Sequence, residues 1–110
     1  MRPGKGILAL FVGMLAASNA NAWEANVSDI LQHGTYVAVY LSPDPGPGSC
    51  QYSQPYLMVV DDTPAGKQRF TMIMTALATG HKIAGYDDGC DTAIWAQSRP
   101  LITRLVLRAN

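Results

Sequence analysis

Five aspartates fall in two short clusters and are the first side chains to consider for chemistry: Asp61, Asp62, Asp87, Asp88 and Asp91. Neighbouring carboxylates bind calcium in some proteins and act as a catalytic acid and base in others. The ligand spacing of a calcium-binding loop is absent, so the second cluster is expected to be a solvated turn around Gly89. A hydrolase that uses these carboxylates is a third and lesser hypothesis.

Other catalytic and cofactor motifs are missing from the sequence. Gly66 and Lys67 are followed by Gln68, and the first glycine of a phosphate-binding loop is absent. Serine, histidine and aspartate all occur, but no Gly-x-Ser-x-Gly segment presents a serine nucleophile. We therefore expect a protein that is not an enzyme and that needs no cofactor or metal.

The N-terminal segment has the pattern of a secretory signal peptide. Arg2 and Lys5 form a positive region, and residues 7–17 form an uncharged apolar run that is too short to cross a bilayer. Ala20 and Ala22 then occupy positions −3 and −1 of a cleavage site before Trp23. The pattern predicts removal of residues 1–22 and a periplasmic or secreted protein.

Cys50 and Cys90 are the two cysteines of the chain, and an oxidising compartment favours a disulfide between them. It would close a loop of about 40 residues, which the chain-entropy model values at about 4 kcal/mol at most. The alternative is a reactive thiol pair or a metal site. No Cys-x-x-Cys motif supports that alternative, and His33 and His81 lack the spacing of metal ligands.

The remaining residues, 23–110, have the length of a single domain. Without Arg2 and Lys5, six basic side chains face eight acidic ones, which gives a net charge of −2. The basic residues are scattered, whereas nucleic-acid binders gather them on one surface. The sequence therefore predicts no nucleic-acid partner, and no later apolar stretch is long enough to span a membrane.

The first half of this domain has the pattern of strands. Residues 27–33 alternate weakly, and residues 35–41 are rich in β-branched and aromatic side chains, which predicts a hairpin around Gly34. Three prolines and two glycines in residues 42–49 predict a surface loop. A third strand is expected at residues 56–60.

A helix is expected after this strand. Asp62 or Thr63 is a suitable N-cap, Pro64 suits the first helical position, and Gly80 suits a left-handed C-terminal stop. One apolar stripe of this helix is expected to pack on the core, and it consists of Phe70, Ile73, Met74 and Leu77.

Two further strands are expected at residues 81–86 and 101–108. In the last one, alternation places Leu101, Thr103, Leu105 and Leu107 inward and Ile102, Arg104, Val106 and Arg108 outward. Three strands, a helix and two strands is the element order of the OB-fold. The sequence thus predicts a mainly β, α+β domain: a small five-stranded OB-fold-like barrel with one helix between its third and fourth strands.

Residues 70–86 (FTMIMTALATGHKIAGY) combine a helix, a Thr-Gly junction and a strand, and they resemble the B subunits of AB5 toxins of the subtilase-cytotoxin and typhoid-toxin group. The chain end, a cysteine, a tryptophan and a final strand closing as VLRAN, is similar to the cholera-toxin B subunit. The loop at 42–49 and the cysteine positions depart from both groups. The pattern is equally similar to small exported proteins of proteobacteria.

The resemblance implies a homo-oligomer, a pentamer in the toxin-like case, that binds glycans and has a separate catalytic subunit. It also implies a glycan site at Ser28, Tyr86 and Trp95. The alternative is that Ser28 is an ordinary strand residue and that both aromatic side chains are simply half-buried.

Two functions of different classes follow from the sequence. The first is an exported, non-enzymatic recognition module that binds a glycan or a protein. The second is a periplasmic structural or inhibitor-like protein with a protein partner and no small-molecule site.

Overall fold

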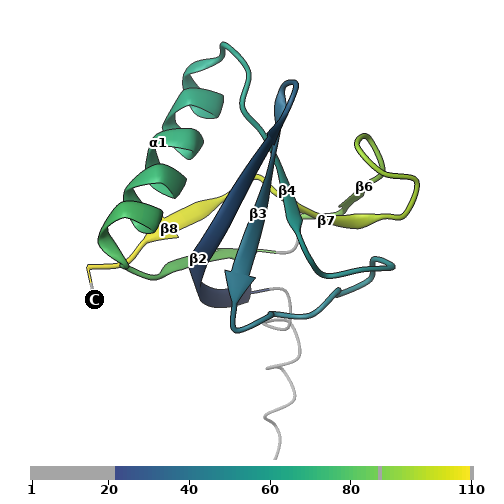
Figure 1. Ribbon diagram of the computed structural model, residues 1–110, viewed down its shortest axis with the longest axis horizontal. Helices are drawn as coiled ribbons and strands as arrows, with labels where there is room; N and C mark the ends of the chain where they lie inside the picture. Colours follow the sequence, from purple (N-terminus) through teal and green to yellow (C-terminus); the bar gives the residue numbers. More distant parts are fainter. Residues whose placement is uncertain (1–21, 87, 110) are drawn as a thin grey trace, which may run out of the picture.

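The computed structural model describes residues 22–86 and 88–109. It contains one helix and seven strands (Figure 1): β2 (Ala22–His33), β3 (Tyr36–Ser42), β4 (Tyr56–Val59), α1 (Pro64–Thr79), β5 (Ile83–Tyr86), β6 (Cys90–Asp91), β7 (Arg99–Ile102) and β8 (Leu105–Leu107). The mainly β composition with one helix between the third and fourth strands confirms that part of the prediction.

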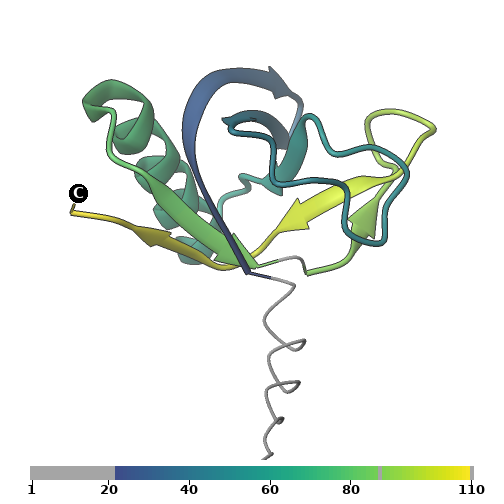
Figure 2. The same cartoon turned by 90° about the horizontal axis from the view of Figure 1, so that it is seen from below.

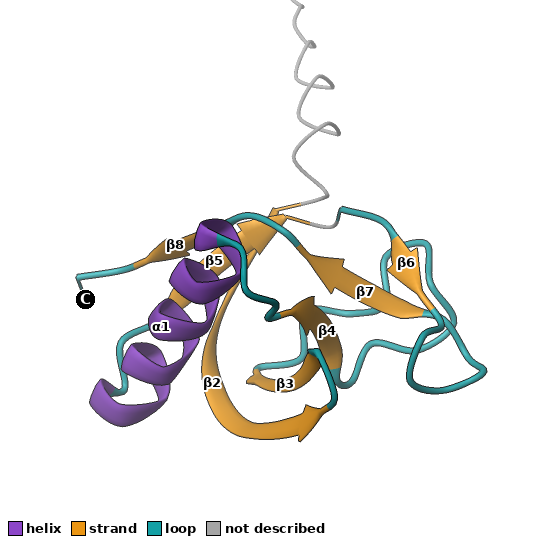
Figure 3. Cartoon of the chain, turned by 90° about the horizontal axis from the view of Figure 1, so that it is seen from above, coloured by secondary structure: helices purple, strands orange, loops and turns teal. Residues whose placement is uncertain are grey.

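Strand β2 organises the sheet because it pairs with two different neighbours. Its first residues, from Ala22 to Ala25, pair with β5, and the rest of the strand pairs with β3. The register with β3 shifts between Val27 and Asp29, which marks a bulge. Bulges increase the local twist of a strand, and Figure 3 shows β2 bending strongly between its two partners.

The prediction of a closed five-stranded barrel is wrong. The seven strands form one open sheet in the order β6-β7-β4-β3-β2-β5-β8, so β6 and β8 are its edges. Strand β7 lies parallel to β4, whereas β8 lies antiparallel to β5 at the other end of this order. The sheet therefore curls, because the backbone of Thr103 and Arg104 joins the edge strand β8 to β7, the neighbour of the other edge strand; the view from below in Figure 2 also indicates this curl.

The strand predicted at residues 101–108 is divided into β7 and β8 by Thr103 and Arg104. This break changes which side chains face the core. Alternation across 101–108 placed Ile102 outward, but Ile102 is 1% exposed and belongs to the core. Leu105 and Leu107 also pack against the core, so the inward side changes by one position across the break. Because the break has two residues, Ile102 before it and Leu105 after it both face the core. A strictly alternating strand does not predict this.

The helix begins and ends as predicted. Thr63 accepts a hydrogen bond from the Gly66 backbone amide at 3.0 Å, and Pro64 is the first helical residue. Gly80 has φ of 79°, a left-handed conformation that glycine adopts without steric cost, and its N–H donates to the carbonyl of Ala76.

The apolar stripe of the helix is only partly buried, which corrects the prediction. Ile73 is fully buried, but Phe70, Met74 and Leu77 are 40%, 43% and 39% exposed. The core side of α1 is centred instead on Gly66, Ile73 and Ala76. The curled sheet therefore covers only the side of the helix around Ile73, and the other apolar residues of the predicted stripe stay partly exposed.

The predicted signal peptide lies outside the described residues except for Ala22, so it stays a prediction. Among residues 22–86 and 88–109, no helix is long and apolar enough to cross a membrane. Figure 1 places α1 and the C-terminal end on one side of the molecule and β6 with the β6–β7 loop on the opposite side.

Candidate functional site

Two aromatic rings and an arginine gather at the end of the molecule that carries β6 and β7. The guanidinium carbon of Arg99 lies over the Trp95 ring, 4.6 Å from its centroid, and over the Tyr52 ring, 5.1 Å from its centroid. Guanidinium groups are attracted to aromatic faces at these distances. We call Tyr52, Trp95 and Arg99 the aromatic–arginine platform.

The platform combines residues from two loops and a strand, and a disulfide ties these segments together. Cys50 and Cys90 form the predicted bond, with their Cα atoms 5.7 Å apart. It joins the loop that carries Tyr52 to β6, the strand that pairs with β7. The two aromatic side chains are therefore held on segments that cannot separate while the protein is oxidised.

Hydrogen bonds between the same segments fix the backbone beside the rings. The amide of Gln51 donates to the Ser98 hydroxyl, the amide of Ser98 donates to Gln51 Oε1, and both distances are 2.9 Å. The amide of Tyr52 donates to the Ser98 carbonyl at 3.0 Å. Arg99 Nε donates to the Gln54 carbonyl at 3.2 Å, and this bond holds the guanidinium against the faces of the two rings.

The platform is open to solvent. Tyr52 is 49% exposed, the most exposed of the large apolar side chains in the described part of the chain. An aromatic ring that is fixed in position offers apolar contact area at low entropic cost, and neighbouring amides and hydroxyls can donate and accept hydrogen bonds. The arrangement is suited to recognition.

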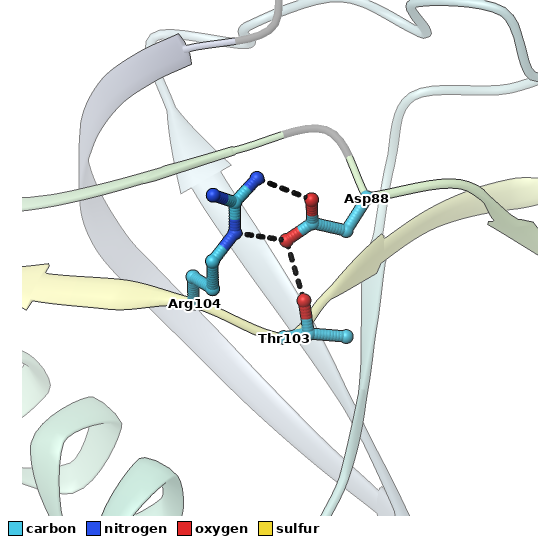
Figure 4. A network of polar contacts seen from close by, with 3 residues as sticks. All are labelled: Asp88, Thr103 and Arg104. Carbon is cyan, nitrogen blue, oxygen red and sulfur yellow. Dashed lines mark hydrogen bonds and ion pairs between the residues drawn. The ribbon is translucent and has the colours of Figure 1, made fainter.

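A second polar cluster lies at the junction of β7 and β8 (Figure 4). Both carboxylate oxygens of Asp88 accept hydrogen bonds from Arg104, at 2.6 Å from Nη2 and 3.0 Å from Nε, and the Thr103 hydroxyl also donates to Oδ2. The Arg104 guanidinium lies over the Tyr86 ring, 4.2 Å from its centroid. We call this set the Asp88 clamp.

The Asp88 clamp accounts for one aspartate of the second cluster. The hydrogen bonds from Arg104 lower the pKa of the Asp88 carboxyl, with a smaller contribution from Thr103 and opposition from partial burial. Because both oxygens are occupied, Asp88 holds the break between β7 and β8 rather than offering a free base. Asp91 accepts from the Tyr36 hydroxyl at 2.9 Å, a bond that raises the pKa of Tyr36.

Asp87 lies outside the described residues. Within the described ranges, no three side chains of histidine, cysteine, aspartate or glutamate are grouped to hold a metal ion.

The three residues that the toxin resemblance singled out contact different partners. Ser28 lies on β2 and donates to the Tyr40 carbonyl at 3.2 Å, Tyr86 belongs to the Asp88 clamp, and Trp95 belongs to the platform. Tyr86 pairs with Ala22, six positions before Ser28 on β2, which corresponds to a strand path of about 20 Å. Among residues 22–86 and 88–109, no hydrogen bond or ring contact joins any two of the three.

Tyr52 and Arg99 were not singled out from the sequence. Tyr52 follows the proline- and glycine-rich loop, and Arg99 precedes Pro100, so neither lies in a recognisable motif. The available signal was the cysteine pair, because a disulfide at Cys50 and Cys90 brings residues near 52 and near 95–99 to one end of the fold.

Comparison of the chain with protein-family models, with curated proteins and with solved structures finds no match in any of the three.

Proposed function

We propose that this protein is an exported, non-enzymatic recognition module that binds a carbohydrate on the aromatic–arginine platform. The observation that carries the proposal is the half-exposed Tyr52 ring. The ring lies on a loop that the disulfide fixes, and the Arg99 guanidinium packs against it. The apolar face of a pyranose packs on such a ring, while its hydroxyls require donors and acceptors close by.

Polar groups for the sugar hydroxyls lie beside the ring. Gln51 uses its Oε1 to accept from the backbone of Ser98, which orients the amide and leaves its NH₂ group as a donor. Ser53 donates to Asp44 at 2.7 Å, so a carboxylate also lies near the same loop. An aromatic face with a few oriented polar groups is the usual composition of a small-ligand site.

The sequence supports the same function independently. The resemblance to glycan-binding B subunits includes Trp95, which belongs to the platform, and the signal-peptide pattern supports export. The open sheet, with one helix after its third strand, is compatible with the partly open Greek-key barrel of the OB-fold. The resemblance further supports a homo-oligomer, and the edges of the open sheet at β6 and β8 are available for pairing with another subunit.

A glycan array probed with the oxidised protein, residues 23–110, tests the proposal. We expect binding to a defined glycan set that is lost in Tyr52→Ala and strongly reduced in Trp95→Ala. Tyr86→Ala is the matched control, because Tyr86 is also a half-exposed tyrosine under an arginine. Binding that survives Tyr52→Ala but not Tyr86→Ala would move the site to the Asp88 clamp, and an empty array would refute carbohydrate binding.

A second candidate function, a structural or inhibitor-like role with a protein partner, is favoured by a different observation. Phe70, Met74 and Leu77 form an exposed apolar stripe along one side of α1, and exposed apolar patches often mark protein interfaces. Affinity capture from periplasmic extract by wild type, but not by Leu77→Lys, together with an empty glycan array, would favour this function over the first.

A further inference from the structure

Strand β2 has a strand neighbour on both sides only along its first residues. Residues 22–25 pair with β5, whereas the strand from Asn26 onward pairs with β3 alone. In the described part of the chain, no backbone hydrogen bond outside the β2–β3 ladder reaches residues 28–33. We call the side of these residues that faces away from β3 the open edge of β2.

The hairpin turn determines which backbone groups lie on the open edge. The turn between β2 and β3 has two residues, so its closing pair, His33 and Tyr36, is a hydrogen-bonded pair. Hydrogen-bonded and non-hydrogen-bonded pairs alternate along an antiparallel ladder. Ile30 and Gln32 therefore direct their N–H and C=O groups away from β3, and the open edge offers two donors and two acceptors.

Helix α1 lies along the open edge (Figures 1 and 3). The Asn26 side-chain amide donates to the Gly80 carbonyl at 2.9 Å, which ties the end of the helix to β2. Near the start of the helix, Gln32, Lys67 and Phe70 line one cavity of about 390 Å³. The strand from Asn26 to Gln32 and the helix from Lys67 to Gly80 both span about 20 Å, so they run side by side in opposite directions.

The side of α1 that faces this cavity is apolar. Phe70 lines the cavity, and Met74 and Leu77 follow it at i+4 and i+7 on the same face of the helix. These three side chains are between 39% and 43% exposed. A chain segment placed beside Ile30 and Gln32 would thus meet backbone partners on one side and apolar side chains on the other.

The open edge requires an extended partner, and the helix decides against a second copy of this chain. Only a strand presents donors and acceptors at the spacing of Ile30 and Gln32, about 7 Å. The open edge of β2 and the edge strand β8 both lie beside α1, so two such edges cannot approach without a collision of helices. The other edge strand, β6, has only two residues. A single peptide segment carries no helix and avoids this collision.

The charge at one end of the open edge specifies the segment further. Asp61, Asp62 and Lys67 line the cavity beside Gln32, and two acidic groups and one basic group give this end a net charge of −1. A basic side chain at the matching end of the peptide complements this charge. In an antiparallel arrangement, the end of the peptide beside Gln32 is its N-terminal end.

We propose that the open edge of β2 binds an extended peptide segment of a partner protein as an added antiparallel strand. Its apolar side chains occupy alternate positions and pack against Phe70 and Met74, and a basic residue precedes them. This inference does not depend on carbohydrate binding. It specifies the kind of protein partner that the second candidate function requires.

The test is an NMR titration of ¹⁵N-labelled oxidised protein, residues 23–110, with the peptide acetyl-Lys-Thr-Val-Thr-Val-Thr-amide. We expect saturable shifts at the amides of Ile30 and Gln32 and along α1 around Met74. Residues paired across a ladder share one face of the sheet, so the valines that face α1 are also the residues that hydrogen-bond to β2.

Two N-methylated forms of the peptide test this arrangement from the side of the ligand. Methyl groups on the two valine amides remove the donors that face β2 and should weaken binding at least about tenfold. Methyl groups on the two threonine amides that follow the valines point away from β2 and should change the affinity less than about twofold. Equal binding of the two forms would overturn the proposal.

Substitutions at Gln32 test the same edge from the side of the protein. Gln32→Pro removes the N–H of the open edge and should weaken binding about tenfold, because proline is tolerated on a strand edge that has no partner. Gln32→Ala is the matched control, since it removes the side chain but keeps the N–H, and should bind as the wild type does. Met74→Gln should weaken binding about three- to tenfold through lost apolar contact.

The melting temperature and the amide spectrum of each variant check its fold, and the N-methylated peptides decide the question if Gln32→Pro does not fold. Shifts that map away from β2 and α1, or equal affinity of Gln32→Pro and Gln32→Ala, would refute strand addition. Self-association of the wild type that Gln32→Pro abolishes without peptide would assign the edge to a second copy instead. The glycan-array signal of Gln32→Pro should equal that of the wild type, which separates this surface from the platform.

Discussion

Asp88 lies beside the two residues that separate β7, which pairs with β4, from β8, which pairs with β5. Its carboxylate contacts both of these residues, Thr103 and Arg104. Thr103 and Arg104 donate to it, and the amide of Leu101 donates to the neighbouring Gly89 carbonyl at 2.9 Å. Charge-assisted, two-point contacts between a carboxylate and a guanidinium are directional. This residue therefore fixes the geometry of the junction between β7 and β8.

Asp88→Asn should lower the free energy of unfolding by about 0.5–1 kcal/mol at pH 7, a small value because solvent screens the exposed Arg104. The pKa of Asp88 is lowered in the folded state, so its contribution is present above the unfolded pKa and is lost as the pH falls through the folded value. Urea unfolding of both proteins at pH 7 and at pH 2.5 measures this. An equal difference at both pH values would show that charge is not the cause.

Gly85 shows how tightly the beginning of the domain is packed. A Cβ atom at Gly85 would overlap the indole ring of Trp23, which packs edge-on against Tyr56 with the centroids 5.3 Å apart. Trp23 is the residue predicted to follow the signal-peptide cleavage site. The mature chain predicted from that site would thus begin with a side chain that packs against the core.

Gly85→Ala should destabilise the protein by about 1–3 kcal/mol, the usual cost of overpacking. The double variant Gly85→Ala with Trp23→Leu distinguishes two causes of destabilisation. One is the collision of the new methyl group with the indole, and the other is the change of backbone freedom when glycine is replaced. We expect the alanine at position 85 to cost less in the Trp23→Leu background than in the wild type, as measured by thermal or urea unfolding. Equal costs in both backgrounds would contradict a collision with the indole.

The helix is the element whose limits the sequence predicts best, because its signals are local. Thr63, Pro64 and Gly80 act on neighbouring backbone groups, so no tertiary information is needed to place them. The last strand behaves differently. Thr103 and Arg104 fit an uninterrupted alternating strand, and the break depends on Asp88, which lies 15 and 16 positions earlier in the chain.

Thr63→Ala removes the cap of α1 and should cost about 1 kcal/mol. For a domain of this size the melting temperature should then fall by about 4–8 °C. Thr63→Ser keeps the hydroxyl that accepts from Gly66 and donates to Asp61, and should retain most of the stability. A serine variant as unstable as the alanine variant would mean that the methyl group, and not the cap, is responsible.

At the scale of the whole molecule, the disulfide connects the fold to the candidate site. It spans 40 positions of sequence and ties the loop of Tyr52 to the strand pair that carries Arg99. The cysteine pairing was predictable from the cysteine count and the predicted signal peptide. The platform was not, because it depends on which residues of two irregular loops come to lie over one guanidinium.

The paired substitution of Cys50 and Cys90 by alanine should lower the free energy of unfolding by about 2–4 kcal/mol. The loss should be accompanied by increased mobility of Trp95, because the two loops are no longer tied. Urea unfolding measures the stability, and ¹⁵N relaxation of the Trp95 indole N–H measures its mobility separately from that of Trp23. A stability change below about 0.5 kcal/mol would contradict a structural role for this bond.

The most direct measurement of the proposed recognition function uses the two tryptophans of the chain as internal probes. Trp95 lies in the platform, whereas the indole nitrogen of Trp23 is buried and has no hydrogen-bond partner among the described residues. The glycan with the strongest array signal is titrated into ¹⁵N-labelled oxidised protein, and the two indole N–H signals are followed. We predict a saturable shift of the Trp95 signal, together with the amides of Tyr52 and Ser98, while the Trp23 signal stays fixed. Shifts confined to Ser28 and Tyr86 with an unchanged Trp95 signal would contradict recognition at the platform.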